Sequence, residues 1–409
     1  MKRIAFDNSH LSSLNSLFQE VCMDTFLGYP RPNGRAGTRN YLAVIPTVFC
    51  ANEVAMAVAK KFKSARPLLH HQGCAQLKPD SDRVTRTLIS LGANPNVGGV
   101  LLIALGCESV SLPEVYKGLK DRGQKVEKVL IQEIGGMKKA VKRGVELAAK
   151  LDQSVSKMKR KPVPASQIAM GIKCGSSDTT SGLVSNPATG KASDLLLAQG
   201  GTVIFGETTE FIGAEHLLAR RAVSGEVASR ILQIVTSMED RVKALGFDMR
   251  GGNPTPGNIR GGLTTIEEKS LGAICKSGSM PIDGVLEYGE SVPGKGLFVL
   301  DSPGKEAEIM TGLSAAGANV IVFSTGGGAP QGYPIVPVIK VAGNPAKVRV
   351  MKDHIDLDAS GVLAGQTTID EVGQKVYDAL LAVGSGKKVR AEALKYDQTV
   401  EIYTTGPTI

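Results

Sequence analysis

The chain has 409 residues, which is enough for two or three domains with a well-buried core. Apolar residues make up 42% and charged residues 21%, a composition that indicates a globular protein and excludes a disordered one. The formal net charge is +9, but Lys and Arg are spread along the chain and no nucleic-acid motif accompanies them. Only 4% of residues are aromatic, so platforms for stacking bases are scarce. We therefore expect no nucleic-acid partner. A positive field also concentrates small anionic substrates.

Neither a membrane span nor a secretion signal is indicated. The longest apolar stretch, Tyr41 to Ala59, is interrupted by Pro46, Asn52 and Glu53. The apolar run before Asp7 is too short for a signal peptide. We expect a cytoplasmic protein. Its six cysteines contain no CxxC pair, so they should be reduced thiols rather than a disulfide framework.

The predicted elements alternate between strands and helices. Residues 1–27 form an extension with a short amphipathic stretch, Leu11 to Val21. Apolar runs predict strands at 41–48, 100–105, 128–132, 167–172, 202–205, 296–300, 319–323 and 335–341. Amphipathic patterns predict helices at 53–62, 137–151, 225–245, 306–316 and 369–383. Continuous apolar strands separated by helices indicate mostly parallel sheets covered on both faces, which is the α/β class.

A basic segment with two prolines, Lys159 to Ser166, is the best internal boundary. It separates a smaller α/β domain at 28–158 from a larger, Rossmann-like domain at 166–409.

The most informative segment runs from Gly171 to Ala188. It follows an apolar run and places Cys174, Ser176, Ser177 and Asp178 in one turn. A polar turn at the carboxyl end of a parallel strand is a common place for ligands in α/β proteins. The sequence therefore predicts a binding or catalytic site at this turn.

Two further clusters contain metal-ligand or acid/base side chains. His70 and His71 precede Cys74, and imidazole with thiolate suits iron or zinc. Cys107 and Glu108 follow another strand, although a lone cysteine is more often a small apolar core residue.

After the strand at 202–205 come Glu207, Glu210, Glu215 and His216, which favours metal binding or proton transfer. The alternative is that these carboxylates stabilise the start of a helix.

Glycine-rich turns could bind the acid group of a substrate. Arg260, between two such turns, can grip a carboxylate with both guanidinium nitrogens. Thr325 and Gly326, within STGGG, could belong to a nest of backbone amides that binds an anion, or simply to a tight turn. A Walker A motif and a GxGxxG fingerprint are absent, which disfavours a nucleotide-dependent oxidoreductase.

Eight segments resemble, in order, motifs of the altronate/galactarate dehydratase family, which eliminates water from sugar acids. The segments are 28–40 (GYPRPNGRAGTRN), 70–76 (HHQGCAQ), 105–108 (LGCE), 171–188, 206–216 (GETTEFIGAEH), 253–270 (NPTPGNIRGGLTTIEEKS), 301–304 (DSPG) and 323–338 (FSTGGGAPQGYPIVPV). Two positions depart from the family: Ala75 and Ser176 stand where relatives usually have glycine. Such changes should preserve the turns only if φ is negative there.

The resemblance implies several further properties. Relatives have a dimerisation domain followed by a Rossmann-like domain, and they depend on iron, so we expect Fe²⁺ or another divalent metal and a homodimer. Full-length relatives also carry a small β-clip (SAF) domain before the region matched here. A separate small β-clip subunit is therefore an expected partner.

Three functions stay open. The first is a metal-dependent hydro-lyase acting on an altronate- or galactarate-type acid, since such a reaction needs a base, an acid and a cation that stabilises an enediolate. The second is the sulfo-lyase branch of the family, which expels sulfite from (2R)-sulfolactate. The third is a non-catalytic subunit that binds a sugar acid.

We expect the candidate residues to form one pocket at the carboxyl-terminal edge of the strands. Candidate catalytic residues are His71, Asp178, Glu207 and Glu210. Candidate substrate-binding residues are Ser176, Ser177, Asn253, Arg260, Thr325 and Gly326. Candidate metal ligands are Cys74, Glu108, Cys174 and His216.

Overall fold

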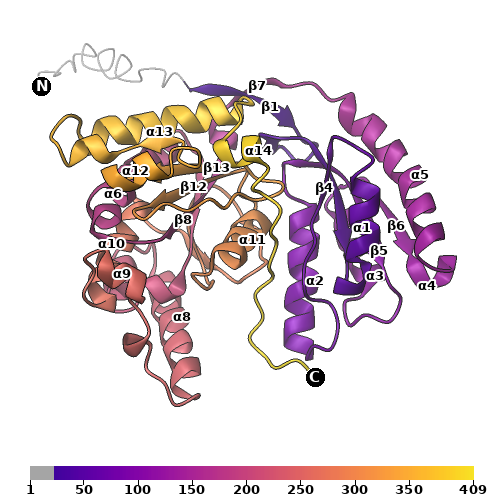
Figure 1. The fold of residues 1–409 in the computed structure, drawn as a ribbon, viewed down its shortest axis with the longest axis horizontal. Coiled ribbons are helices and arrows are strands. Elements are labelled where there is room, and N and C mark those ends of the chain that lie inside the picture. The colour runs from indigo at the N-terminus through magenta and orange to yellow at the C-terminus, as the bar shows by residue number, and fades with distance from the viewer. Residues whose placement is uncertain (1–22) are drawn as a thin grey trace, which may run out of the picture.

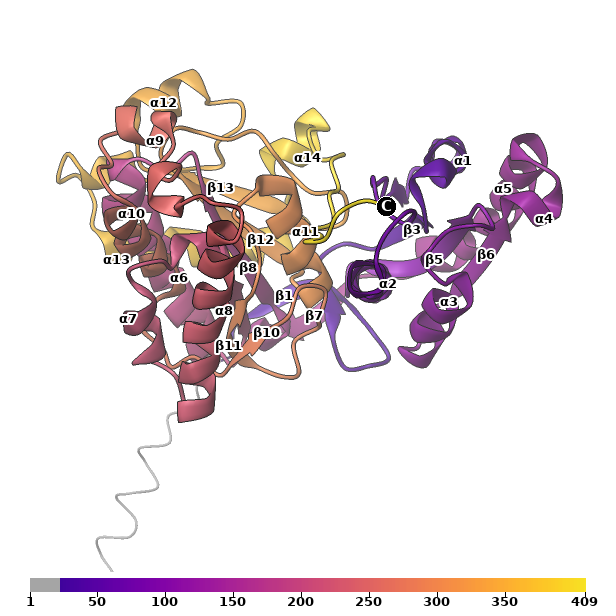
Figure 2. The same cartoon turned by 90° about the horizontal axis from the view of Figure 1, so that it is seen from below.

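The computed structural model describes residues 23–409, which form two α/β units side by side (Figure 1). The predicted amphipathic stretch 11–21 lies outside the described residues. Seen from below, the helices of each unit lie on both sides of its sheet (Figure 2). The α/β class predicted from the alternating pattern is confirmed.

The first unit contains a four-stranded parallel sheet in the order β4-β3-β5-β6. Alternate strand residues face two apolar layers: Leu42 and Val44 pack toward α1 and α5, whereas Ala43 and Ile45 pack toward α2 and α3. The bounds are β3 Tyr41–Pro46, α1 Asn52–Ala59, β4 Ala65–Pro67, α2 Lys78–Gly92, β5 Val97–Ala104, α3 Leu112–Asp121, β6 Val126–Leu130, α4 Ile131–Ile134 and α5 Met137–Ser156.

The second unit contains a seven-stranded sheet in the order β10-β11-β9-β8-β12-β13-β14, in which all neighbours are parallel. The bounds are β8 Ala169–Gly175, β9 Thr202–Phe205, β10 Gly284–Leu286, β11 Gly296–Leu300, β12 Val320–Thr325, β13 Val338–Ala342 and β14 Leu357–Asp358. The chain proceeds from β8 to β9 on one side and from β12 to β13 on the other. The strand order therefore reverses beside β8, where doubly wound sheets open a ligand crevice.

Helices cover both faces of this larger sheet (Figures 1 and 2). Their bounds are α6 Asn186–Ala198, α7 Glu215–Ala219, α8 Gly225–Lys243, α9 Pro256–Arg260, α10 Ile266–Ile274, α11 Glu306–Ala316, α12 Pro345–Val350, α13 Ile369–Gly384 and α14 Arg390–Leu394. The short α9 and α10 follow α8 and bring the segment 255–269 to the carboxyl edge of the sheet.

A small antiparallel sheet, β2-β1-β7, connects the units. Its bounds are β1 Thr25–Pro30, β2 Ala36–Gly37 and β7 Lys161–Pro164. β7 therefore lies inside the segment predicted as a boundary, and β1 begins inside the predicted extension. β7 is an edge strand of this sheet and, among the described strands, pairs only with β1. Its two prolines are tolerated because a residue whose amide would face away from β1 needs no N–H group for the sheet.

The two units share an apolar interface. Leu88 and Leu91 of α2 belong to the same core cluster as Met310 and Leu313 of α11. The segment after α14 then returns to the first unit, where the amides of Thr405 and Gly406 donate to Asp80 at 3.0 and 2.6 Å.

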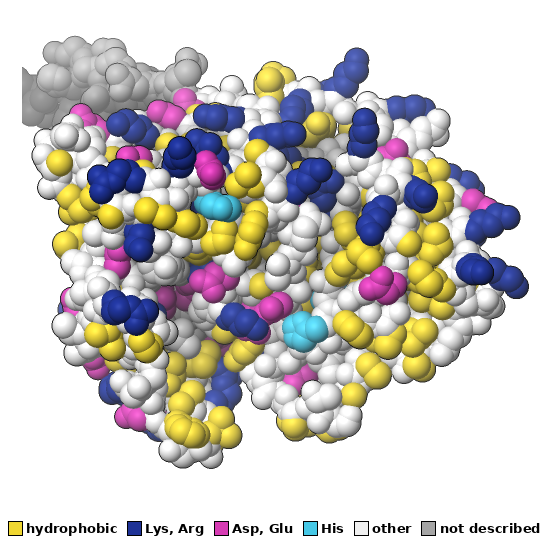
Figure 3. All heavy atoms as spheres, in the orientation of Figure 1, with side chains coloured by type: hydrophobic (Ala, Val, Ile, Leu, Met, Phe, Trp, Pro, Cys, Tyr) yellow, Lys and Arg dark blue, Asp and Glu magenta, His cyan; other side chains and the backbone are white. Residues whose placement is uncertain are grey.

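Among residues 23–409, no helix is both long and apolar enough to cross a membrane. In the view of Figure 3 the Lys and Arg side chains are scattered over the face and do not form one continuous patch.

Candidate active site

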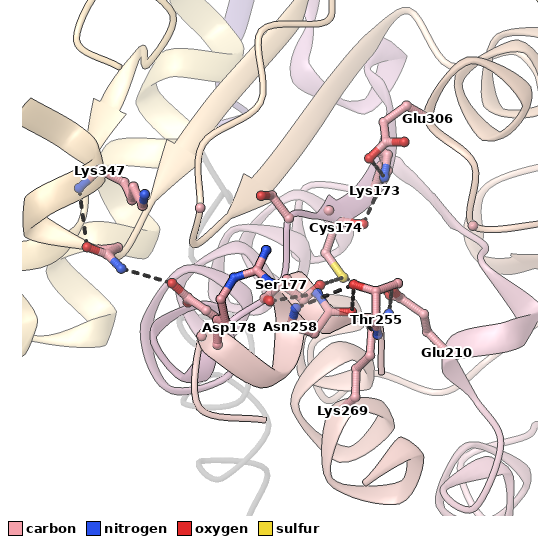
Figure 4. Close-up of a pocket in the computed structure, with 18 residues that line it drawn as sticks. Lys173, Cys174, Ser177, Asp178, Glu210, Thr255, Asn258, Lys269, Glu306 and Lys347 are labelled. Atoms are coloured by element: carbon pink, nitrogen blue, oxygen red, sulfur yellow. Dashed lines mark hydrogen bonds and ion pairs between the residues drawn. The ribbon is translucent and has the colours of Figure 1, made fainter. Parts of the chain in front are cut away.

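A pocket of about 580 Å³ lies at the carboxyl-terminal edge of the seven-stranded sheet. Loops that follow β8, β9, β11, β12 and β13 contribute to it, together with α9 and α10 (Figure 4). Its lining residues are Lys173, Cys174, Gly175, Ser176, Ser177, Asp178, Glu210, Thr255, Gly257, Asn258, Arg260, Gly261, Lys269, Gly304, Glu306, Gly327, Asn344 and Lys347. The pocket therefore occupies the crevice expected where the strand order reverses.

The turn after β8 forms one wall of the pocket. Asp178 is buried there, and its carboxylate accepts hydrogen bonds from the Thr180 hydroxyl at 2.7 Å, the Ser181 amide at 2.9 Å and the Asn344 amide group at 2.9 Å. A Cβ added to Gly326 would lie 1.8 Å from Asp178 Oδ1, so glycine is required by close approach. Asp178 is thus held rigidly and connects the β8 turn to the loop after β13.

The two positions that depart from the family pattern both have positive φ: 51° at Ser176 and 54° at Ala75. The condition that φ be negative is therefore not met. Each residue occupies the left-handed region, which costs a non-glycine residue on the order of 1 kcal/mol. In the pocket, this conformation projects the exposed Ser176 next to Gly327, where an added Cβ would lie 2.3 Å from the serine hydroxyl.

A buried ionic network lies under the pocket floor. Glu207 is fully buried, and its carboxylate accepts from the Cys174 amide at 2.9 Å, from Lys173 Nζ at 3.2 Å and from Lys276 Nζ. Glu210 accepts from the Cys174 thiol at 2.8 Å and forms an ion pair with Lys276 at 3.4 Å. Cys174 and Glu210 thus line the pocket, whereas Glu207 lies beneath it and does not.

The segment 301–304 holds the turn that carries Glu207. The Ser302 hydroxyl accepts from the Glu207 amide at 3.0 Å, and Asp301 accepts from the Thr208 hydroxyl at 2.8 Å. Glu207 itself has φ of 74°, a left-handed conformation that a non-glycine residue adopts at some cost. These contacts account for the DSPG segment as a support of the neighbouring turn.

The network sets the pKa values of its members. Burial, followed by the negative charge of Glu210, raises the pKa of Glu207. Burial alone would also raise the pKa of Glu210, but Lys269 and Lys276 outweigh it and lower this pKa to about 2. Burial and the charge of Glu210 raise the pKa of the Cys174 thiol, so the thiol is protonated near neutral pH. Burial favours neutral Lys276, but the surrounding acidic groups raise its pKa and keep it charged.

The distances suit a metal, but the charges do not. Possible ligand atoms of Cys174, Glu207 and Glu210 all lie within 4.8 Å of one another. However, the Lys276 ammonium already contacts Glu207 and lies 3.4 Å from both Cys174 Sγ and Glu210 Oε2. Lys173 and Lys269 pair with the same two carboxylates, and Lys173 also pairs with the partly exposed Glu306 at 3.4 Å. The lysines therefore already compensate the carboxylates, so these residues do not fit a divalent cation while Lys276 holds this position.

Cations and hydroxyl-binding groups face the pocket from several loops (Figure 4). Lys173, Arg260, Lys269 and Lys347 supply positive charge along the lining. Among residues 23–409, the side chains of Arg260 and Lys347 form no ion pair, and both residues are exposed. They are therefore available to an anionic ligand.

Four other candidates lie outside this lining. Asn253 accepts from Lys269 Nζ at 2.9 Å and so orients a pocket lysine from behind. Thr325 accepts from the Gly328 amide at 3.0 Å, and the Gly327 amide donates to Ser176 O. These amides serve a tight turn and are not free for an anion. Gly326 makes room for Asp178, and His216 is exposed on α7.

His71, Cys74 and Glu108 lie in the first unit, at the carboxyl edge of the other sheet. The structure does not bring them into the pocket, because the strands they follow belong to a separate sheet. Glu108 accepts from the Thr47 hydroxyl at 2.7 Å and from the Gly106 amide at 2.5 Å. Its carboxylate therefore connects neighbouring loops.

Several site residues were missed from the sequence: Lys173 and Lys276 in the buried network, and Thr255, Asn258, Lys269 and Lys347 in the lining. Lys173 stands inside an apolar strand, and that position was the available signal, because a buried lysine needs acidic partners. Lys276 follows α10 in an ordinary polar turn, and nothing in its local sequence indicates burial.

Comparisons with known proteins agree with this architecture. The family model described as D-galactarate/Altronate dehydratase, C-terminal, matches residues 165–408, and the model described as D-galactarate dehydratase/Altronate hydrolase, second domain, matches residues 28–156. The (2R)-sulfolactate sulfo-lyase subunit beta of Chromohalobacter salexigens is 41% identical over 380 residues, which cover 92% of this chain and 96% of that protein.

Two dehydratases are also similar. The altronate dehydratase of Bacillus subtilis is 35% identical over 396 residues, covering 94% of this chain and 78% of the relative. The galactarate dehydratase (L-threo-forming) of Escherichia coli is 36% identical over 388 residues, covering 89% and 73% respectively.

Proposed function

The chain belongs to the D-galactarate/altronate dehydratase family, and we propose that it is a lyase that eliminates water from a sugar acid of the altronate or galactarate type. The observation that carries this proposal is the lining of the pocket. Positive groups alternate there with hydroxyl and amide groups in a space of about 580 Å³. Such a lining suits a carboxylate with a chain of hydroxyl groups.

The cations at the rim bind the substrate's acid groups. Arg260 offers a planar pair of donors that matches a carboxylate, and Lys347 adds a second charge. Ser177 and Asn258, which are hydrogen-bonded to each other through the Ser177 carbonyl at 2.8 Å, and Thr255 face the hydroxylated chain. This arrangement holds the carbon next to the carboxylate toward Glu210.

Glu210 is the proposed proton acceptor. It lines the pocket and is ionised because Lys269 and Lys276 stabilise its charge. A bound anionic substrate raises its proton affinity. The proton leaves the carbon next to the carboxylate and goes to Glu210, while the Lys173 and Lys269 ammonium groups stabilise the enediolate. The neighbouring hydroxyl takes this proton from Glu210 and departs as water, and the resulting enol tautomerises to a 2-keto-3-deoxy acid.

Glu207 is proposed as a positioning residue. It does not reach the pocket, but it holds Lys173, Lys276 and the Cys174 amide in place. Its loss should change the positions and pKa values of groups that do face the substrate.

The resemblance implies iron, and Fe²⁺ dependence stays a prediction for the whole enzyme. Because the Cys174, Glu207 and Glu210 group is compensated by lysines, we assign it no metal and derive no step through one. Chelation followed by separate addition of Fe²⁺, Mn²⁺ and Mg²⁺ measures whether activity needs an ion. Undiminished activity in a metal-stripped sample contradicts the dependence.

A second candidate is elimination of sulfite from sulfolactate. It is favoured by the 41% identity to a sulfo-lyase subunit over 96% of that protein's length. The same removal of a proton next to a carboxylate starts both reactions. A dianion with carboxylate and sulfonate groups also suits a lining that contains Arg260 and Lys347.

Product analysis separates the two candidates. The purified protein is incubated with altronate, galactarate and sulfolactate, and 2-keto-3-deoxy acid and sulfite are measured. A keto acid from a sugar acid, lost in Glu210→Gln and retained in the exposed control Glu226→Gln, supports the first function. Sulfite release from sulfolactate alone establishes the second.

Because the sulfo-lyase relative is named as one subunit, we also propose that a small second subunit completes the enzyme. Activity should then rise strongly when a β-clip subunit is added. Full turnover by the isolated chain contradicts this partner.

A further inference from the structure

A second hollow lies between the two units, at the edge of the sheets opposite to the active-site pocket. It consists of two adjoining cavities of about 620 and 260 Å³, and Asn33, Arg35 and Pro95 line both of them. Val97 and Ala169, which also line these cavities, are the first residues of β5 and β8. None of the described lining residues belongs to the active-site pocket as well. We call the two cavities together the basal site.

Positive charge dominates the lining of the basal site. Its cationic residues are Arg31, Arg35, Arg122, Lys125 and Lys295. Among the described lining residues the carboxylate is Asp121, and it pairs with Lys117, outside the lining, at 2.9 Å. The lining residues therefore do not neutralise the cations.

Arg35 lies between the two cavities, at the end of the loop that joins β1 to β2, and its guanidinium is available. It stands next to the carboxyl-terminal end of α11, since a Cβ added to Gly317 would lie 3.0 Å from Arg35 Nη1. The Ser314, Ala315 and Ala316 carbonyls at this helix end already accept hydrogen bonds from other groups. Among residues 23–409, no hydrogen bond or ion pair engages the Arg35 guanidinium. Its five N–H donors therefore face the basal site without acceptors.

Arg122 and Lys295 flank Arg35, one from each unit. Arg122 Nη1 donates to two serine hydroxyls at 3.0 and 3.2 Å, and Lys295 Nζ donates to the Ser166 carbonyl, so the acceptors of both cations are neutral. Burial, followed by the charge of Arg122, lowers the pKa of Arg35. Burial, followed by the charge of Arg35, lowers the pKa of Lys295. The three cations thus repel one another across the hollow.

Contacts between the units fix the walls of the basal site. The side chain of Asn94, in the first unit, donates to Ser314 O at 2.8 Å and to Ala318 O at 2.9 Å. The Thr38 hydroxyl donates to Asn319 O at 2.6 Å. Asn94 and Asn319 line the cavities themselves. The cations are therefore held in place before any ligand arrives, which lowers the cost of binding.

We propose that the basal site binds a small organic anion with several acidic oxygens, held by Arg35, Arg122 and Lys295. Guanidinium groups match the paired oxygens of carboxylates and phosphates, so polycarboxylates and phosphate esters share the required chemistry. The larger cavity, of about 620 Å³, has the size of a small-molecule site. Such an anion neutralises the repelling cations. Because Arg122 and Lys295 belong to different units, it also joins the units to each other.

Isothermal titration calorimetry of the full chain tests the proposal. Pyrophosphate and citrate are titrated separately, without substrate and at constant ionic strength, because salt screens charge. We expect at least one probe to bind, and the tighter probe assigns the acid group as phosphate or carboxylate. Arg35→Met and Arg122→Met should each raise its Kd at least about tenfold, since each removes a charge-assisted contact. Exposed Arg220→Met is the matched control, and Arg260→Met alters the active-site pocket, so both should retain this binding.

Three outcomes contradict the proposal. A Kd above about 1 mM for both probes would show that no such site exists. Binding that is lost in Arg260→Met but kept in Arg35→Met would place the anion in the active-site pocket. Equal losses in Arg35→Met and Arg220→Met would show an adventitious ion only.

A thermal measurement checks the same site independently. The tighter probe should raise the Tm of the parent protein and raise that of Arg35→Met clearly less, because a ligand stabilises the folded state that binds it. An equal rise in both proteins contradicts the site. Circular dichroism checks the fold of each variant, and exposed Arg122→Met keeps the test decisive if Arg35→Met does not fold. Turnover is not measured, so failure here is distinguishable from failure of the proposed lyase activity.

Discussion

Replacing Glu207 by glutamine tests the buried ionic network most directly. The substitution keeps the shape of the side chain but removes the carboxylate that pairs with Lys173 and Lys276. Lys276 then keeps Glu210, at 3.4 Å, as its carboxylate partner. Breaking a buried ion pair on one side costs about 3 to 5 kcal/mol, because the remaining charge loses its partner. For a domain of this size, about 4 kcal/mol corresponds to a fall in Tm of about 8 to 16 °C.

A double substitution identifies charge as the cause. Adding Lys276→Met to Glu207→Gln removes the ammonium group that the first substitution leaves without its nearest carboxylate. The double variant should therefore be more stable than the sum of the two single effects predicts, by on the order of 1 to 3 kcal/mol. Glu226→Gln, on the exposed first turn of α8, is the matched control and should change stability by less than about 0.5 kcal/mol.

Differential scanning calorimetry of the parent, Glu207→Gln, Lys276→Met, the double variant and Glu226→Gln measures these values. A Tm of Glu207→Gln within 2 °C of the parent would refute the network as described. Strict additivity in the double variant would show that Glu207 and Lys276 are not coupled.

Three further predictions concern single positions. Because the pKa of Glu210 falls from 4.5 to about 2, its stabilisation is full above pH 4.5 and is lost as pH falls toward 2. The stability difference between the parent and Glu210→Gln should shrink by about 3 kcal/mol over that range, and urea unfolding that shows a constant difference contradicts it. Arg260→Met should raise KM at least about tenfold with little change in kcat, since it removes a carboxylate contact, whereas exposed Arg220→Met should not. Gly326→Ala, whose Cβ would lie 1.8 Å from Asp178, should cost about 1 to 3 kcal/mol in thermal unfolding, and Gly294→Ala, which meets no atom within 4 Å, should be neutral.

Most of the sheet framework could be predicted from local sequence. Strands such as 202–205 and 296–300 are continuous apolar runs because both faces of a parallel sheet are covered, and the structure places strands with the same bounds. Shorter edge strands such as β4 and β14 were not predicted. Three or two residues carry no periodicity, and their pairing depends on neighbours distant in sequence.

The pocket could be predicted only in part, for a related reason. The turn 174–178 is recognisable because a polar cluster follows an apolar strand. Parallel strands end at one edge only if they belong to the same sheet, and local sequence does not show which strands share a sheet. The prediction of a single pocket therefore placed Cys74 beside Cys174, although the strands they follow belong to different sheets. Lys276 could not be predicted, since its burial depends on partners 66 and 69 residues away.

The return of the segment after α14 to the first unit has a consequence for how the protein is made. Gly406 donates to Asp80 across 326 residues of sequence, and the Ile409 amide donates to Ala75 O in the loop next to Cys74. On the ribosome, the whole second unit must be synthesised before these contacts can form. Contacts this distant in sequence slow folding, and partly folded chains with exposed edges are prone to aggregate. The Cys74 loop thus acquires these neighbours only after the second unit has been synthesised.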